Sequence, residues 1–309
     1  MKFAQLVHLK FCMLLSLIVI SIGVSANEID GLKTDKQVLA FIKKLSPKDE
    51  RIGRTSFNAH YSYDSKTQKT ADSLGVKNWV KIDFDKNGET DLIAFNLSRF
   101  ELVVVLCFNG NYVILNPSNS GIRYHLVYPI IKRNKHKNLI LIYHQDEIIK
   151  RPSYIDDETF YTSLACDTIH YENGMFLNYY QNLEKHSIES ISIKSTNNDV
   201  GGEMNMEIDF INLKDSCFQL EGYRELAEKY TYKLTNEEIL KIKYLLEQSN
   251  ISKLNDNFKY GMEHYQHYKI EIIYDNGKVK KFEDKGGVVN YNFSEIYNMM
   301  YNFKWVKAK

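Results

Sequence analysis

The strongest constraint on the fold of this chain is a series of short apolar segments separated by tight-turn sequences. From Trp79 onward the apolar side chains fall at alternate positions, with Val80, Ile82 and Phe84 on one side. Because successive side chains of a β-strand point to opposite faces, this period of two predicts a strand with one buried face. Asn109-Gly110 separates two further apolar runs, and Asn-Gly is a strong signal for a two-residue hairpin. These signals predict antiparallel strands joined by hairpins.

Residues 27–183 are expected to form a mostly antiparallel β domain with a leading helix. Thr34 and Gln37 have the spacing of a capping box, and an apolar stripe of helical period follows them. Residues 48–76 are polar and predict a loop or an irregular strand. The expected strands are, in order, 79–84, 92–95, 102–108, 112–115, 124–131, 138–144, 168–171 and 175–179.

Residues 184–309 are expected to form a second domain of the α+β class, a β meander with two helices. We place the boundary in the poorly apolar stretch 181–187. Thr235 with Glu238 predicts the start of one helix, and Asn292 with Glu295 predicts the start of the last. The expected strands are 188–194, 204–213, 217–222, 268–274 and 278–282. The residues expected to face the core are Ile239, Ile242, Leu245 and Leu246 in the first helix, and Phe293, Ile296, Met300 and Phe303 in the last.

Residues 1–26 have the three parts of a secretory signal peptide. Lys2 and Lys10 supply positive charge, an apolar run follows to Val24, and Val24-Ser25-Ala26 offers the small side chains that a signal peptidase reads. The apolar run is about 14 residues long, short of the roughly 20 that a membrane-spanning helix needs. We therefore expect cleavage after Ala26 and an exported protein, periplasmic or secreted, with no stable membrane span after cleavage.

The charge balance gives no reason to expect a strongly charged partner. The chain has 40 Lys and Arg against 39 Asp and Glu; removal of the signal deletes Lys2 and Lys10 and no acid, so 38 remain against 39. Nucleic acid binding normally requires a basic excess on one face. The densest basic cluster, residues 132–137, is interpreted as a solvated hairpin tip, with an anionic partner as the alternative. Nucleic acid is therefore not an expected partner.

Three cysteines follow the signal segment: Cys107, Cys166 and Cys217. Disulfides can form outside the cytoplasm, but an odd number of cysteines leaves room for at most one internal bridge. A chain of this length buries a core without crosslinks, so we expect these cysteines mainly to pack in the core. A Cys107–Cys166 disulfide is the alternative.

The sharpest local signal is the acidic loop of residues 83–91 between two predicted strands. A turning loop brings alternate residues together, and Ca²⁺ takes about six to eight oxygen ligands. An EF-hand is excluded, because position 12 is Ala94 and not Glu. The predicted ligands are Asp83, Asp85, Asn87, Glu89 through its carbonyl, and Asp91, with Gly88 at position 6.

The spacing Asp-x-[Asp/Asn]-x-[Asp/Asn]-Gly-x-x-Asp-Leu, which ends here at Asp91-Leu92, resembles the calcium hairpins of integrin-type propeller repeats. The chain holds one copy, so the resemblance implies a structural Ca²⁺ and not a propeller. The alternative is a plain hairpin in which Asn87-Gly88 supplies the turn and the acids are solvated. Lys81 and Lys86 would then offset part of the repulsion between the carboxylates.

The second half carries a further pattern, a Tyr-x-Leu-[Ser/Thr]-x-Glu-Glu helix start, a strand ending in Tyr-Asp-x-Gly-Lys and a Trp after the last helix. The matching residues are Tyr232, Leu234, Thr235, Glu237, Glu238, Tyr274, Asp275, Gly277, Lys278 and Trp305. This pattern resembles a family of exported bacterial proteins of unknown function. The resemblance implies no activity, and the cysteine pair that the family has at the start of this domain is missing here.

Two further groups have the residue types of catalysis or metal binding. Cys166, Asp167 and His170 fall in one predicted strand, where local spacing does not create a triad. His264 and His267 enter another strand, where residues three apart point to opposite faces. Neither group is expected to be a site.

These features predict a non-catalytic protein of the cell envelope that binds a protein or small-molecule partner, with Ca²⁺ as a structural ion. The alternative is a cell-envelope hydrolase whose site is assembled from dispersed residues. A concave pocket holding two or more carboxylates, or a His with a partner, would favour the hydrolase.

Overall fold

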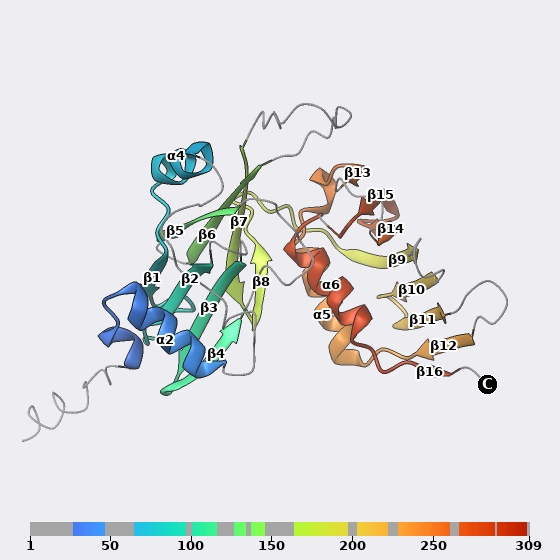
Figure 1. The fold of residues 1–309 in the computed structure, drawn as a ribbon. Coiled ribbons are helices and arrows are strands. Elements are labelled where there is room, and N and C mark those ends of the chain that lie inside the picture. Colours follow the sequence, from blue (N-terminus) through green and yellow to red (C-terminus); the bar gives the residue numbers. More distant parts are fainter. Residues whose placement is uncertain are drawn as a thin grey trace, which may run out of the picture.

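The computed structural model describes residues 27–46, 65–96, 101–115, 127–133, 137–145, 164–196, 203–221, 228–259, 266–287 and 289–307. Within these ranges the chain has the predicted α+β class, with three sheets and four α-helices (Figure 1). The predicted signal peptide, His264 and the side chain of Cys217 lie outside what the structure describes. No helix in the described ranges is long and apolar enough to cross a membrane.

The first sheet has the strand order β1-β2-β3-β4. Its strands are β1 (Trp79–Ile82), β2 (Asp91–Asn96), β3 (Glu101–Phe108) and β4 (Asn111–Leu115). As the period of two predicts, Ile82 and Phe84 are buried in one cluster and Val80 packs against it. Asn109 and Gly110 have φ angles of 51° and 74°, which the tight turn between β3 and β4 requires.

The second sheet has the order β5-β6-β7-β8 and shares a core with the first. Its strands are β5 (Val127–Arg133), β6 (Asn138–Gln145), β7 (Leu164–Glu172) and β8 (Met175–Asn178). Tyr128, Ile140 and Ile169 of this sheet lie in one apolar cluster with Phe95 and Val104 of the first sheet. The pairing of apolar faces explains why both sheets can form from such short strands.

The third sheet has the order β13-β15-β14-β9-β10-β11-β12-β16 and is antiparallel except where β13 pairs with β15. Its strands are β9 (Ile188–Thr196), β10 (Glu203–Asp209), β11 (Lys214–Glu221), β12 (Glu228–Tyr232), β13 (Asn257–Lys259), β14 (His267–Tyr274), β15 (Lys278–Lys285) and β16 (Val306–Lys307). Residues 210–213, predicted as strand, instead form the turn into β11, with Leu213 at a φ of 51°. A tight antiparallel connection requires such a reversal of the chain.

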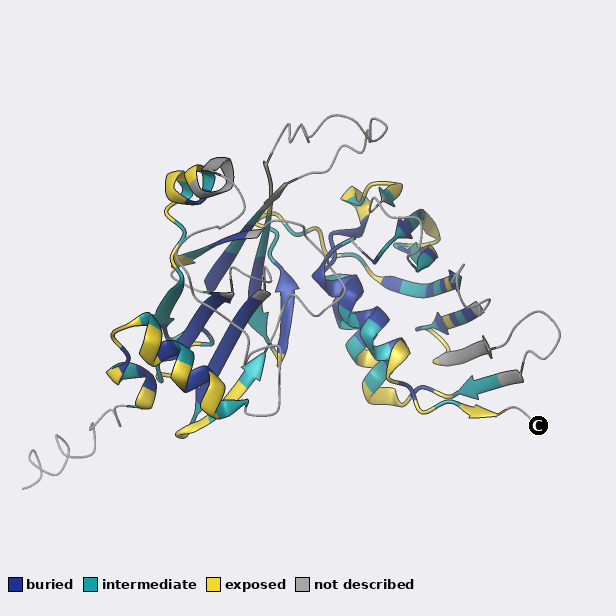
Figure 2. Ribbon diagram, in the orientation of Figure 1, coloured by how far each residue is buried: buried dark blue, intermediate teal, exposed yellow. Residues whose placement is uncertain are grey.

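The predicted capping boxes give the correct starts of two helices, α2 and α5. The helical segments are η1 (Glu28–Gly31), α2 (Asp35–Leu45), α4 (Ser65–Leu74), α5 (Asn236–Glu247), η3 (Ile251–Lys253) and α6 (Tyr291–Tyr301). Thr34 with Gln37 and Thr235 with Glu238 both form reciprocal capping boxes. The residues predicted to face inward from the two helices are all buried, although Phe303, predicted within the last helix, lies beyond the end of α6 at Tyr301. In Figure 2, exposed and buried residues alternate around α2, whereas α6 is buried or half-buried along nearly all of its length.

The prediction of a loop or irregular strand over residues 48–76 was wrong for residues 65–74, which form α4. Ala71 is buried, and Leu74 and Val76 pack against the core of the first half. Gly75, at a φ of 68°, follows the last helical residue, and the Val76 N–H donates back to the Ala71 carbonyl. A glycine in this position is a common helix end, so Gly75 was the missed signal.

The predicted start of the last helix was wrong by two residues. The side chain of Asn290 accepts the hydrogen bond from the Phe293 N–H, so Asn290 is the cap. Asn292 lies inside the helix with no exposed surface, where its oxygen accepts from the Asn178 N–H. The tertiary partner in β8 therefore overrides the local capping preference of Asn292.

Helices α5 and α6 lie between the third sheet and strand β8 (Figure 1). Met175 and Leu177 of β8 join the cluster of α5, α6 and the third sheet, whereas Phe176 joins the cluster of the first two sheets. Tyr291 of α6 also reaches that second cluster. The predicted boundary at 183 falls between β8 and β9, and the division into two domains stays a prediction.

A buried polar network fastens β8 to α6. The Asn178 side chain accepts from the Tyr291 N–H at 2.6 Å, and the Asn178 N–H donates to the Asn292 side chain at 2.9 Å. Asn292 donates in turn to the Ser249 hydroxyl, which donates to the Leu245 carbonyl. Because these groups are shielded from water, loss of one partner leaves another unsatisfied.

Asn178→Ala is therefore expected to lower the free energy of unfolding by about 1–3 kcal/mol, since the Tyr291 N–H loses its buried acceptor. Urea unfolding measures the change. The control is Asn302→Ala, because Asn302 is exposed at the other end of α6 and should alter stability by about 0.5 kcal/mol or less. Equal effects of the two substitutions would contradict the assignment.

Candidate metal centre

The predicted metal loop connects β1 to β2, and the Ile82–Asp91 pair closes it. Lys86 and Gly88 have positive φ angles of 63° and 93°, which turn the chain back on itself. Gly88 suits such a conformation, because an L side chain rarely adopts it. The loop therefore brings Asp83, Asp85 and Asp91 close together.

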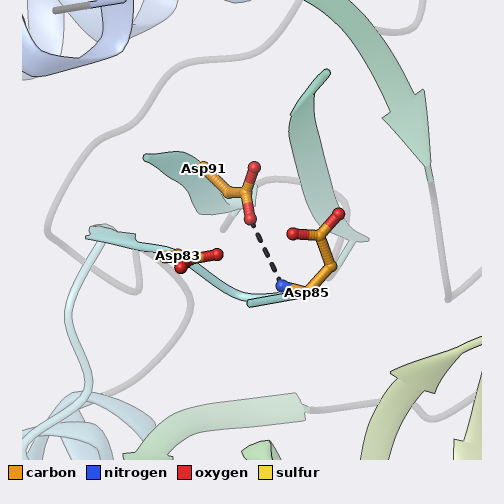
Figure 3. Close-up of side chains that lie close together, drawn as sticks. All are labelled: Asp83, Asp85 and Asp91. Atoms are coloured by element: carbon orange, nitrogen blue, oxygen red, sulfur yellow. Dashed lines mark hydrogen bonds between the residues drawn. The ribbon is translucent and has the colours of Figure 1, made fainter. Parts of the chain in front are cut away.

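Three of the five predicted residues converge. Asp83, Asp85 and Asp91 each offer a carboxylate oxygen, and these oxygens lie within 4.8 Å of one another (Figure 3). One oxygen of Asp83 accepts from the Gly88 N–H at 3.0 Å. The other, Oδ1, is buried and has no hydrogen-bond partner within the described part of the chain. A buried carboxylate oxygen with no donor is unusual and suits a cation ligand.

Asp91 is the buried member of the group, with no exposed surface. Its Oδ2 accepts from the N–H of Phe84 at 2.7 Å and from the N–H of Asp85 at 3.4 Å. Its Oδ1 accepts from the N–H of Cys107 at 2.8 Å. This carboxylate therefore binds the loop to strand β3 in addition to facing the other two acids.

Asn87 and Glu89 have side chains engaged with neighbouring backbone. The Asn87 amide donates to the Cys107 carbonyl at 2.6 Å, and its oxygen accepts from the Glu89 N–H at 2.7 Å. The Glu89 carboxylate accepts from the N–H groups of Asn109 and Gly110, at the turn between β3 and β4. The side chain of Glu89 thus lies outside the group of three carboxylates, and its carbonyl as a metal ligand stays a prediction.

Burial and repulsion by neighbouring acids both disfavour the charged forms of Asp85 and Asp91. Burial raises the pKa of Asp91 to about 7, although its hydrogen bonds from backbone N–H groups act in the opposite direction. Burial, followed by the charges of Asp83 and Glu89, raises the pKa of Asp85. A divalent cation between the three would reverse this balance, because it favours the ionised form of each ligand.

Of the two lysines predicted to offset the repulsion, Lys81 is engaged elsewhere. The Nζ of Lys81 donates to the carbonyls of Asp30 and Leu32 at 2.8 and 3.0 Å. Lys81 therefore ties the first described residues to β1 and does not serve as a hydrogen-bonded counterion within the loop.

The cysteine expectations hold in part. Cys107 is buried, as expected of a packing residue, whereas Cys166 is exposed. Both thiols are free, so the alternative Cys107–Cys166 disulfide is wrong. The two residues lie on β3 and β7, in different sheets.

Two histidines in the described ranges contact acidic residues but do not form clusters with metal-ligand spacing. His170 of β7 is buried beside Lys137 and Glu172, and burial lowers the pKa of its imidazole. His186 lies 2.6 Å from Asp275, a contact that spans 89 residues of sequence and that no local pattern could predict. Within the described ranges, the Asp83–Asp85–Asp91 group is the cluster with metal-ligand spacing.

A polar hollow of about 410 Å³ lies on the third sheet, between β9, β14, β15 and the segment before β13. Three carboxylates, from Asp256, Glu271 and Glu283, line it together with three lysines, Lys194, Lys269 and Lys281. Lys281 pairs with Glu271 at 2.6 Å, and Lys280 pairs with Asp256 at the same distance. Lys269 and Lys285 lie 3.9 and 3.7 Å from Glu283. The hollow holds more than the two carboxylates that would favour a hydrolase. Each of these carboxylates, however, is ion-paired with a lysine.

No protein-family model, no curated protein and no solved structure matches this chain. The resemblances to calcium hairpins and to an exported bacterial family therefore stay predictions. The case for a metal site rests on the convergence of the three carboxylates and on the buried Oδ1 of Asp83.

The raised pKa of Asp91 predicts how stability depends on pH in chelator. The folded state holds the Asp91 proton more tightly than the unfolded state, so this contribution is full below about pH 4 and is lost as pH rises through about 7. Urea unfolding between pH 5 and 8 should show a falling component, with a slope of up to about 1.4 kcal/mol per pH unit. The component should be absent in Asp91→Asn; equal slopes in both proteins would contradict it.

Proposed function

We propose that this chain is an exported, non-catalytic protein of the cell envelope that binds a partner and whose first half is fastened by a structural Ca²⁺ at the β1–β2 loop. The metal is supported by the convergence of Asp83, Asp85 and Asp91 and by the buried Oδ1 of Asp83, which has no hydrogen-bond donor among the described residues. The signal-like residues 1–26 support export.

The donor set favours Ca²⁺ over other common ions. All three convergent side chains offer hard carboxylate oxygens, and a turning loop also exposes backbone carbonyls to the same point. Zn²⁺ prefers nitrogen and sulfur ligands, which the cluster lacks among the described residues. Mg²⁺ requires stricter octahedral geometry than an irregular loop supplies.

The position of the loop supports a structural role. Its residues hydrogen-bond to the first described segment through Asn27 and Thr90, and to the β3–β4 hairpin through Glu89. Asn138, at the start of β6, donates to the Asp83 carbonyl. An ion that fixes this loop would therefore fix the mutual arrangement of three parts of the first half.

The polar hollow supports a binding role over a catalytic one. Its three carboxylates are each paired with a lysine, so none of them is free to act as a general acid or base. The hydrolase remains the second candidate, because Glu271 and Glu283 lie in the same hollow. To act as a general acid or base, Glu271 or Glu283 would have to break its ion pair with a lysine and contact the substrate instead.

Excess Ca²⁺ is expected to stabilise residues 27–309 by roughly 2.7 kcal/mol at about 100 times the dissociation constant. This corresponds to a rise of about 5–10 °C in Tm relative to chelator. Asp85→Asn should abolish the rise, whereas Asp256→Asn, which removes an exposed carboxylate far from the loop, should retain it. A rise of equal size in Asp85→Asn would contradict the site.

The hydrolase candidate is tested by incubating the protein with peptidoglycan and with envelope polysaccharide, and by following released fragments by mass spectrometry. We expect no release above a blank. Release that Glu271→Gln or Glu283→Gln abolishes, with Glu237→Gln at an exposed position of helix α5 as the charge-matched control outside the hollow, would establish the hydrolase instead.

A further inference from the structure

Residues 27–32 pack into the hydrophobic core of the first half. Ile29 has no exposed surface and Leu32 is buried, both in the cluster between α2 and the first sheet. The Glu28 N–H donates to the Tyr112 hydroxyl at 3.0 Å, and the Glu28 carboxylate pairs with Lys44 at 2.7 Å. The chain is therefore held from its first residues after the signal segment.

Asn27, the residue after the predicted cleavage point, is held by four hydrogen bonds. Its side chain donates to the Thr90 carbonyl at 2.7 Å and accepts from the Asp30 N–H at 3.2 Å. Its carbonyl accepts from the same N–H at 3.1 Å. Its backbone nitrogen lies 3.0 Å from the Asp30 carboxylate, to which it donates. Thr90 precedes Asp91, so Asn27 touches the strand that carries the buried acid of the metal loop.

We propose that export cuts the Ala26–Asn27 bond and that the new α-ammonium group of Asn27 is a structural group, paired with Asp30 and joined to the metal loop through Thr90. The inference rests on the proposed export of the chain. A membrane signal peptidase would add water across the peptide bond, leaving a carboxylate on Ala26 and an ammonium on Asn27.

Cleavage of the Ala26–Asn27 bond would strengthen the contact between the Asn27 nitrogen and the Asp30 carboxylate. In the uncut chain the Asn27 nitrogen is a neutral amide donating one bond to Asp30, which is an ordinary capping-box contact. After cleavage the same nitrogen is charged and has three donors at the same place, and charge-assisted hydrogen bonds are about twice as strong as neutral ones. Glu28 and Asp30, both in the first turn of η1, offset the cost of a positive charge at a helical N-terminus.

The first experiment determines where the exported protein begins. The full chain is expressed in an exporting bacterial host, fractionated, and its N-terminus is determined by intact mass and N-terminal sequencing. We expect a protein beginning at Asn27 in the envelope or medium. An exported protein that is uncut, or cut elsewhere, would overturn this inference and leave the proposed export intact, whereas retention in the cytoplasm would contradict the proposed function itself.

The second experiment tests the ammonium. Two proteins are prepared with a tag protease that leaves no extra residue, one beginning at Asn27 and one at Ala26. The Asn27 form is expected to have the higher Tm by about 1–3 °C, because the Ala26 form restores a neutral amide at Asn27. Asp30→Asn should remove this difference, and Asp256→Asn should preserve it. Equal Tm values for the two forms, or a difference that survives Asp30→Asn, would overturn the structural role of the ammonium.

Discussion

The first half of the molecule depends on a carboxylate held where water does not reach it. Asp91 accepts hydrogen bonds from Phe84, Asp85 and Cys107 and so joins the β1–β2 loop to β3. Burial of a charge costs several kcal/mol unless partners offset it, and three N–H groups do so incompletely, because the pKa of Asp91 stays near 7. This incomplete compensation is the physical basis of the cation site that we propose at the loop.

The β1–β2 loop also connects several segments of the first half. The same loop receives hydrogen bonds from Asn27, Asn138 and the β3–β4 turn, in three directions. A change in the charge of the loop therefore acts where the first described residues and both sheets of the first half meet. Metal binding here would stabilise tertiary arrangement more than it stabilises any one strand.

Local chemistry predicted much of the fold, and long-range partners account for the errors. The caps at Thr34 and Thr235 and the hairpin at Asn109-Gly110 need neighbours only a few residues away, and all appear as predicted. The convergence of Asp83, Asp85 and Asp91 was predictable for the same reason, because one loop carries all three.

Some of the missed features depend on residues distant in the sequence, whereas the helix end at Gly75 and the cap at Asn290 were local signals. The Glu89 carboxylate is used by a turn about 20 residues away, and Asn292 is drawn into the helix interior by Asn178, 114 residues before it. Helix α4 has a weak apolar stripe of its own and packs on a core that other segments build. No window of sequence contains those partners, so pattern alone could not weigh them.

Strand β8 has a consequence for how the chain reaches its final state. All four of its residues are buried, with Phe176 facing one core and Met175 and Leu177 facing the other. The helix that covers the second side begins at Tyr291, more than a hundred residues later. Chains are synthesised from the N-terminus. The first two sheets can therefore form before α6 exists, and the side of β8 that carries Met175 and Leu177 then stays exposed to water. Nascent chains that stall before residue 291 would be the aggregation-prone species, and completion of α6 would turn two separately forming cores into one cooperative unit.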